Sequence, residues 1–238
     1  MPGYSRRELK HDRFAESAQG AAKWAGGHRQ AVILTIGLLL VVVIATTGFI
    51  TWHSRQVEQG NIELSAAIRT YEAQLTPADA PAAPADNTPK FTTIADRAKA
   101  AQKLFSTAAD KYSSVAPGKI ARYMSGMAFL QAGDKSGAEQ ELKKAIDSGD
   151  KDVAALAKMA LASLDRESNR APDAIALYKD VSEHPTNTVS KAAAQLELAS
   201  MYETTDPQQA ALIYQQLQKE DPQSAAAQIA AQKLSKSK

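Results

Sequence analysis

The chain has 238 residues, of which 44% are apolar but only 6% are aromatic, and it contains no cysteine. The absence of cysteine excludes disulfides, thiol nucleophiles and cysteine-ligated metal sites. The net charge is only +2, and a chain without a concentrated basic face gives no support for nucleic-acid binding. A composition this poor in aromatic residues favours closely packed helices over a sheet.

Residues 1–30 form a basic segment, with six lysines and arginines against three acids. Leu9 and Phe14 lie near one face of a helix in this segment. We predict a cytoplasmic basic amphipathic helix that is broken at Gly26-Gly27 before the membrane. Two roles remain open for it. It contacts anionic lipid headgroups, or it only sets the topology and has no specific ligand.

Residues 31–52 contain no charged side chain. As a helix they would reach about 33 Å, enough to cross a hydrocarbon core of roughly 30 Å. Trp52 suits the membrane interface. We predict an uncleaved transmembrane helix. The alternatives are a buried core helix, which would normally show a polar stripe, and a cleaved signal peptide, for which no small-residue cleavage site precedes Trp52.

Lysines and arginines are unevenly placed about this span. Six precede it, whereas only Arg55 and Arg69 lie in the twenty residues that follow. Because positively charged flanks remain in the cytoplasm, we expect a cytoplasmic N-terminus and an extracytoplasmic C-terminal part. In a Gram-negative cell, this places the chain as a single-pass protein in the inner membrane, with its C-terminal domain in the periplasm.

Three segments follow the span. Residues 53–75 show helical spacing of apolar side chains and predict a post-membrane helix. Residues 76–90 hold four prolines and five alanines; this proline density excludes helix and strand, so we expect a Pro/Ala-rich linker or loop. Residues 91–238 show a nearly unbroken helical pattern and form the predicted repeat domain.

We predict eight helices in this last region, joined in pairs by short turns. Ser136 opens a capping box. Asp206-Pro207 and Asp221-Pro222 each place an acid at the N-cap and a proline at the first helical position. The expected helices lie near 91–114, 118–132, 136–148, 151–168, 172–183, 188–203, 207–219 and 222–235.

Ala138, Ala174 and Ala210 are spaced 36 residues apart. Each is followed four residues later by a larger side chain, and three residues after that by an apolar one. A fixed period of this length with helical spacing predicts stacked pairs of helices, an architecture that binds other chains. We therefore predict an all-α protein with a single N-terminal transmembrane helix followed by an α-solenoid. The remaining residues of the register are Leu142, Tyr178, Tyr214, Ala145, Val181 and Leu217.

This register resembles the tetratricopeptide repeat. With Ala138 aligned to the small residue that opens the second helix of that motif, Gly126 takes the position that lets the two helices approach closely. Phe129 takes the aromatic position three residues later, whereas Asp165 departs from the motif at the equivalent place. The other matching residues are Leu161, Ala162, Leu198, Ala199 and Tyr202 and, in a degraded upstream unit, Ala101, Phe105 and Ala108.

The whole chain resembles the YfgM-like family, which comprises ancillary Sec translocon subunits with a basic cytoplasmic segment, one span and a periplasmic tetratricopeptide domain. The run from Arg7 to Phe14, Trp24 ahead of the span and the Pro/Ala-rich segment carry this resemblance. It implies a membrane-anchored scaffold that binds the Sec translocon, periplasmic chaperones or unfolded secreted chains. The alternative is a tetratricopeptide adaptor for envelope assembly or cell-division coordination.

No sequence pattern indicates catalysis. The four histidines lack metal-ligand spacing, and no nucleophile elbow or phosphate-binding glycine loop is present. We expect no enzyme activity, cofactor or metal. In tetratricopeptide stacks the first helices line a concave groove, and the resemblance implies a protein-binding groove here. For its two methionines, adaptable binding of apolar segments and packing between helices remain open. The implied groove residues are Tyr123, Met127, Leu130, Met159, Ser163, Arg166, Ser200 and Glu203.

Overall fold

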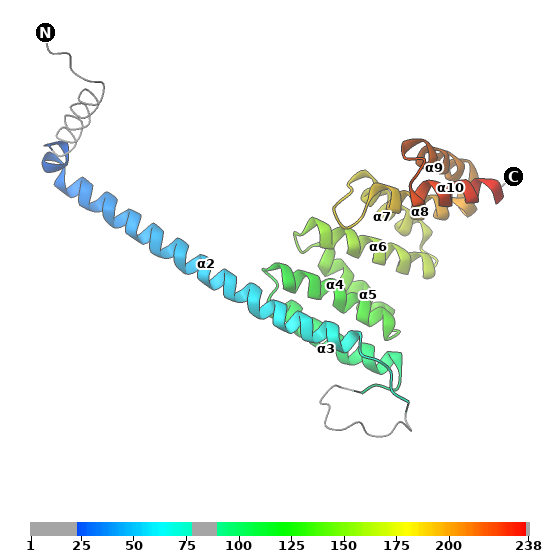
Figure 1. The fold of residues 1–238 in the computed structure, drawn as a ribbon, viewed down its shortest axis with the longest axis horizontal. Helices are drawn as coiled ribbons and strands as arrows, with labels where there is room; N and C mark the ends of the chain where they lie inside the picture. Colours follow the sequence, from blue (N-terminus) through cyan, green and yellow to red (C-terminus); the bar gives the residue numbers. More distant parts are fainter. Residues whose placement is uncertain (1–22, 78–89, 237–238) are drawn as a thin grey trace, which may run out of the picture. The chain divides into compact units, whose positions relative to one another are not determined.

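The computed structural model describes residues 23–77 and 90–236. Within these ranges the chain is helical apart from turns and one isolated bridge between Leu75 and Phe91, which confirms the predicted all-α fold. Each of the eight helices predicted after residue 90 is present, with ends displaced by at most three residues. The helices are α2 (Arg29–Tyr71), α3 (Ile94–Lys111), α4 (Ala116–Gln131), α5 (Lys135–Ile146), α6 (Lys151–Glu167), α7 (Ala171–Glu183), α8 (Lys191–Thr205), α9 (Pro207–Glu220) and α10 (Ala225–Lys236) (Figure 1).

Most of the predicted amphipathic helix lies outside the described residues. The break predicted at Gly26-Gly27 is wrong, because both glycines are helical and the turn falls at His28. The backbone N–H of His28 donates to the carbonyl of Trp24, and the two rings stack with centroids 4.9 Å apart. These contacts span the glycines and keep them helical.

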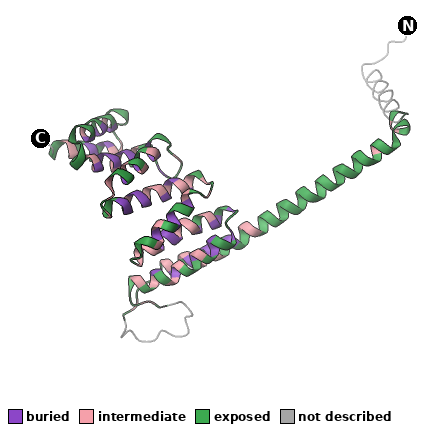
Figure 2. Ribbon diagram, turned by 180° about the vertical axis from the view of Figure 1, so that it is seen from behind, coloured by how far each residue is buried: buried purple, intermediate pink, exposed green. Residues whose placement is uncertain are grey.

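Contacts divide the chain into one unit that ends at Ser54 and another that begins at Arg55. In the first unit the apolar half of α2 is exposed along its length (Figure 2) and is long and apolar enough to cross a membrane. Three threonine hydroxyls in it, those of Thr35, Thr46 and Thr51, donate to carbonyls four residues earlier. Such internal bonds let a hydroxyl enter hydrocarbon without an unsatisfied donor.

The second half of α2 packs within the second unit. Leu64 and Ala67 share a buried cluster with Phe105 of α3. Gly60 permits the close approach, since a Cβ there would lie 2.7 Å from Cγ of Pro117 at the start of α4. This half of α2 is therefore the first helix of the upstream pair, and α3 is the second.

The two ends of the Pro/Ala-rich segment are held together. The N–H of Thr76 donates to the carbonyl of Phe91 at 2.8 Å, and the Arg97 guanidinium donates to the carbonyl of Ala73 at 2.8 Å. The described residues on either side of the Pro/Ala-rich segment therefore lie side by side, and residues 78–89 lie outside the described ranges.

The alanine register forms the core of the helical pairs. Ala138, Ala174 and Ala210 are at most 3% exposed, and the large residues that follow each of them are at most 4% exposed. Gly126 has the predicted role, because a Cβ on it would lie 2.8 Å from Cδ2 of Leu142. The spacing that predicted stacked pairs therefore coincides with the buried contacts between them.

Two predicted helix caps are wrong. The cap of α5 is Asp134, whose carboxylate accepts a hydrogen bond from the backbone N–H of Gly137. Ser136 lies inside the helix. The cap of α10 is Ser224, which accepts from the N–H of Ala227. Asp221 instead lies in the turn before α10, and its carboxylate accepts a hydrogen bond from the backbone N–H of Gln223.

Asp165 replaces the expected aromatic residue with an ion pair. Its buried carboxylate accepts a hydrogen bond of 2.9 Å from the guanidinium of Arg170, which lies at the start of α7. The same guanidinium reaches Glu139 of α5 at 2.8 Å. Asn169 makes the turn with φ of 59°, a left-handed conformation that asparagine tolerates. The ion pair therefore joins α5 to the α6–α7 turn, where an aromatic ring would have packed.

Candidate protein-binding surface

The helices α4, α6 and α8 are the first members of their pairs and carry all eight residues of the implied groove. Contacts join α4 to α6 and α8 to α10. All eight side chains are half-buried or exposed, so each contributes to the surface of these helices. We call this set of eight residues the first-helix surface.

The apolar members of the first-helix surface differ in how far they are committed to packing. Tyr123 and Leu130 pack against the buried cluster around Leu142, and burial raises the pKa of the Tyr123 hydroxyl. Met159 packs against two clusters, which favours a packing role for it. Met127 is half-buried and belongs to none of the described clusters. Among the apolar members of this surface, we therefore take Met127 as the candidate contact for a partner.

The charged members of this surface are already paired. Arg166 donates to Glu197 of α8 at 2.9 Å and more weakly to Ser163 at 3.5 Å. Glu203 pairs with Lys233 of α10 at 3.0 Å. Ser200 lies half-buried on α8 between these pairs in the sequence. Because the charges link successive units, apolar and hydrogen-bonding contacts are left to recognise a partner.

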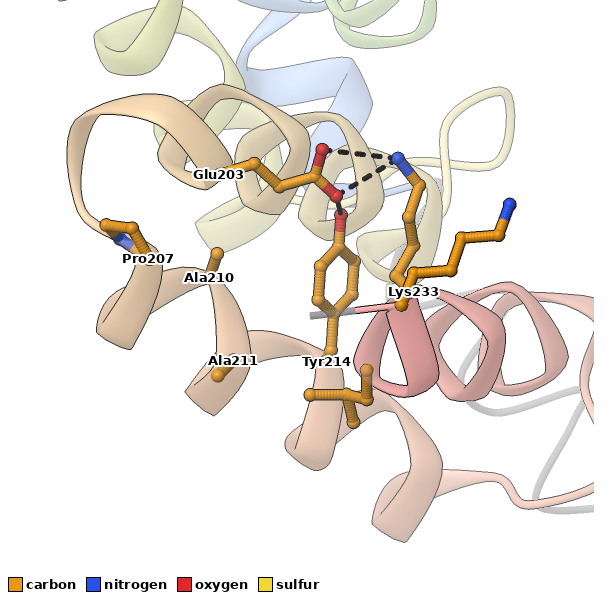
Figure 3. Close-up of a pocket in the computed structure, with 8 residues that line it drawn as sticks. Glu203, Pro207, Ala210, Ala211, Tyr214 and Lys233 are labelled. Atoms are coloured by element: carbon orange, nitrogen blue, oxygen red, sulfur yellow. Dashed lines mark hydrogen bonds and ion pairs between the residues drawn. The ribbon is translucent and has the colours of Figure 1, made fainter. Parts of the chain in front are cut away.

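A cavity of about 280 Å³ lies where α8 ends, α9 begins and α10 ends (Figure 3). The hydroxyl of Tyr214 points at Glu203 and donates to it at 2.7 Å. Burial raises the pKa of Tyr214, and the hydrogen bond to Glu203 raises it further. The lining residues are Glu203, Pro207, Ala210, Ala211, Tyr214, Lys233, Leu234 and Lys236.

Burial alone would raise the pKa of Glu203, but the hydrogen bonds from Tyr214 and Lys233 outweigh it and lower that pKa. Glu203 is thus a stable anion beside a neutral phenol. Sequence reasoning missed this cavity because Glu203 and Lys233 lie 30 residues apart, a separation that no local pattern reports.

A second hollow, of about 580 Å³, crosses α7, α8 and α9. Its lining includes Leu198, Tyr202 and Gln195, and the buried Oε1 of Gln195 has no hydrogen-bond donor among the described residues. In the same described ranges, no three histidine or acidic side chains gather into a group that could hold a metal ion.

Among known protein families, residues 28–187 match the tetratricopeptide repeat-like domain, which is two thirds of the chain. The chain belongs to the tetratricopeptide repeat-like family. No curated protein and no solved structure matches it. The match runs from the apolar half of α2 through α7, so the apolar helix and the first helical pairs fall within one family domain.

Tetratricopeptide repeat-like domains are typically protein-interaction modules without catalytic activity. The first-helix surface is consistent with a protein-interaction module, because it combines apolar, hydroxyl and paired charged side chains on several helices. The geometry therefore favours binding of another polypeptide over chemistry on a small substrate.

Proposed function

We propose that this protein is a membrane-anchored scaffold whose tetratricopeptide repeat-like domain binds other proteins through the first-helix surface. One observation carries the proposal: a single helix, α2, joins an exposed apolar half to a half that is built into the repeat core. The proposed anchor and the first helix of the binding domain are therefore two halves of one continuous helix.

Side chains at the two ends of the apolar run support a membrane span. Trp24 precedes it and Trp52 closes it, and both rings are at least half exposed. The ring of Phe49 lies 6.0 Å from that of Trp52. Tryptophan prefers the interface between hydrocarbon and water, and the basic flank favours a cytoplasmic N-terminus. The repeats would then lie in the periplasm of a bacterium whose inner membrane holds the span.

The distance from span to repeats is short. Only residues 53–59 separate Trp52 from Gly60, the first residue of α2 that is buried in the second unit. Even a fully extended chain would cover at most about 28 Å over this separation. The first helical pair of the repeat domain would therefore begin close to the membrane surface.

This position supports the Sec translocon, periplasmic chaperones or unfolded secreted chains as partners, because secreted chains emerge at that surface in an unfolded, apolar state. Met127, with its flexible thioether, suits varied apolar segments. The second candidate is an adaptor for envelope assembly or cell division, which would use the same surface. The pairing of Arg166 and Glu203 within the stack favours the first reading, because it leaves little free charge for a dedicated partner.

Site-specific crosslinking in membranes tests the proposal. A photoreactive residue would replace Met127, and a control would replace Leu212, which is 58% exposed on the second helix α9. We expect translocon subunits, chaperones or secreted chains to be captured from position 127 alone. Capture of cell-division or peptidoglycan-synthesis proteins would favour the second candidate. Equal capture from both positions would contradict a role for the first-helix surface.

A further inference from the structure

The last helix, α10, has the pattern of a first helix. Ala162 of α6, Ala199 of α8 and Ala230 of α10 share one buried cluster, and each is fully buried. Each of these alanines is preceded by a large aliphatic residue. The preceding residues are Leu161, Leu198 and Ile229. By this register α10 opens a further pair.

The aliphatic residue of α10 lacks the cover that its equivalents have. Leu161 is 5% and Leu198 is 6% exposed, whereas Ile229 is 45% exposed. The clusters around Leu161 and Leu198 include side chains from the second helix of the same pair, Leu177 and Ile213 respectively. Within the described residues no second helix follows α10. The exposed area of Ile229 is thus the area that a second helix covers elsewhere.

The end of α10 borders the cavity in Figure 3, so a second helix that followed α10 would begin beside this cavity. Three residues after the small residue, α4 carries Phe129, whose ring approaches Gly137 in the first turn of α5. At the same register α6 carries Asp165, which binds Arg170 at the start of α7. In α10 this position is Lys233, and it borders the cavity.

Charge at this position is reversed relative to α6. Asp165 of α6 pairs with a cation, Arg170, at the start of the second helix of its pair. Lys233 of α10 would instead pair with an acid at the start of a second helix. Glu203 already accepts from Tyr214 as well as from Lys233. The cavity also carries Lys236, which has no ion-pair partner among the described residues. The rim therefore has an excess of positive charge beside an apolar wall.

We propose that this end of the stack binds an amphipathic helix of a partner protein that carries an acidic side chain at its N-cap, the position that Arg170 takes in α7. The apolar face of that helix would cover Ile229, and its acid would meet Lys236 and Lys233. An acid at the N-cap is also favoured by the helix dipole. The site shares only Glu203 with the first-helix surface, so it stands apart from the proposed groove function.

Two labelled peptides test this site on the full chain in lipid nanodiscs by fluorescence anisotropy. Both have the sequence of residues 170–183, a second helix of this same stack, and one carries Arg170→Glu. We expect the Arg170→Glu peptide to bind at least about tenfold more tightly than the unmodified one, which corresponds to about 1.4 kcal/mol.

Three variants of the full chain locate the binding. Ile229→Glu should weaken the Arg170→Glu peptide at least tenfold. Lys236→Glu should weaken it too and should improve binding of the unmodified peptide. Leu212→Glu, a matched change at an exposed leucine of α9, should leave both unchanged.

Absence of binding, equal binding of the two peptides, or an equal loss in Leu212→Glu would overturn the proposal. Sedimentation supplies a further outcome. If the wild-type chain forms a dimer that Ile229→Glu abolishes, a second copy covers this face and the partner-helix proposal is wrong.

Discussion

The contact between Gly126 and Leu142 gives a sharp test of the repeat core. A Cβ on Gly126 would lie 2.8 Å from both Cγ and Cδ2 of Leu142, which is fully buried. We predict that Gly126→Ala and Leu142→Ala are strongly non-additive in the free energy of unfolding. In the Leu142→Ala background the added methyl group should enter the space that the leucine leaves.

The magnitudes follow from these contacts. Leu142→Ala should cost about 3 to 4 kcal/mol, because the side chain is fully buried between two helices. Gly126→Ala gains about 1 kcal/mol in helix propensity and loses about 1 to 3 kcal/mol by overpacking. Without Leu142 the overpacking disappears, so the same change should then stabilise by about 1 kcal/mol. The coupling between the two sites should therefore be about 1 to 3 kcal/mol.

Urea unfolding of the full chain in detergent, followed by far-ultraviolet circular dichroism, measures this coupling. The pair Gly126→Ala with Leu212→Ala is the control, because Leu212 is largely exposed on α9. That pair should be additive within about 0.5 kcal/mol. Additivity of Gly126→Ala with Leu142→Ala to the same tolerance would refute the close approach of α4 and α5.

Three further predictions concern charges and a turn. Arg122→Met should cost about 2 kcal/mol in unfolding free energy, because it removes the 2.9 Å hydrogen bond to the buried Glu141 and leaves that carboxylate with only Lys144, at 2.7 Å, as a partner. Adding Glu141→Leu should restore most of the loss, and no restoration would contradict a buried ion pair. The pKa of Glu139 is lowered below its ordinary 4.5, chiefly by the hydrogen bond from Lys143, so its stabilisation is full above pH 4.5 and is lost as the pH falls through the lowered pKa. The stability advantage of wild type over Glu139→Gln should therefore shrink below pH 4.5 in acid titrations, and a constant difference would count against this. Gly133→Ala should cost about 1 to 2 kcal/mol in thermal or urea unfolding, since φ is 85° there; an unchanged midpoint would show that the α4–α5 turn can relax.

The alanine register could be read from the sequence because it reflects contacts within one pair of helices. Ala138 and Leu142 lie on one face of α5. The small residue opposite this face, Gly126, lies on α4, which directly precedes α5 in the chain. Local spacing of this kind is set by helix geometry, which the sequence reports directly. The same holds for Asp206, which caps α9 as predicted, with Pro207 at the first position.

Contacts between distant residues were beyond the sequence pattern. In the sequence, Asp165 was only a departure from the motif. Its ion pair with Arg170, which also contacts Glu139, joins three helices through long side chains, and local spacing does not report such contacts. Asp221-Pro222 resembles Asp206-Pro207 in sequence, yet the former makes a turn and Ser224 caps the helix. Which of two adjacent caps is used depends on where α10 packs, and this is decided by buried residues such as Ala230.

The groove residues illustrate the same limit. Their positions on first helices follow from the register, but the partners that neutralise Arg166 and Glu203 lie on the next first helix, 31 and 30 residues away. The packing of α2 against α3 was equally hidden. Gly60 marks it in hindsight, although a single glycine in a helix does not by itself indicate a close contact.

We propose that one span places the repeats on the far side of a membrane from the basic N-terminus. The chain has no cysteine, so single-cysteine variants can be labelled without background. Ser113→Cys, at an exposed residue between α3 and α4, and Ser5→Cys would be treated with an impermeant maleimide in intact spheroplasts. We predict labelling at position 113 before lysis and at position 5 only after lysis. The reverse pattern, or labelling at both positions before lysis, would contradict the anchored topology.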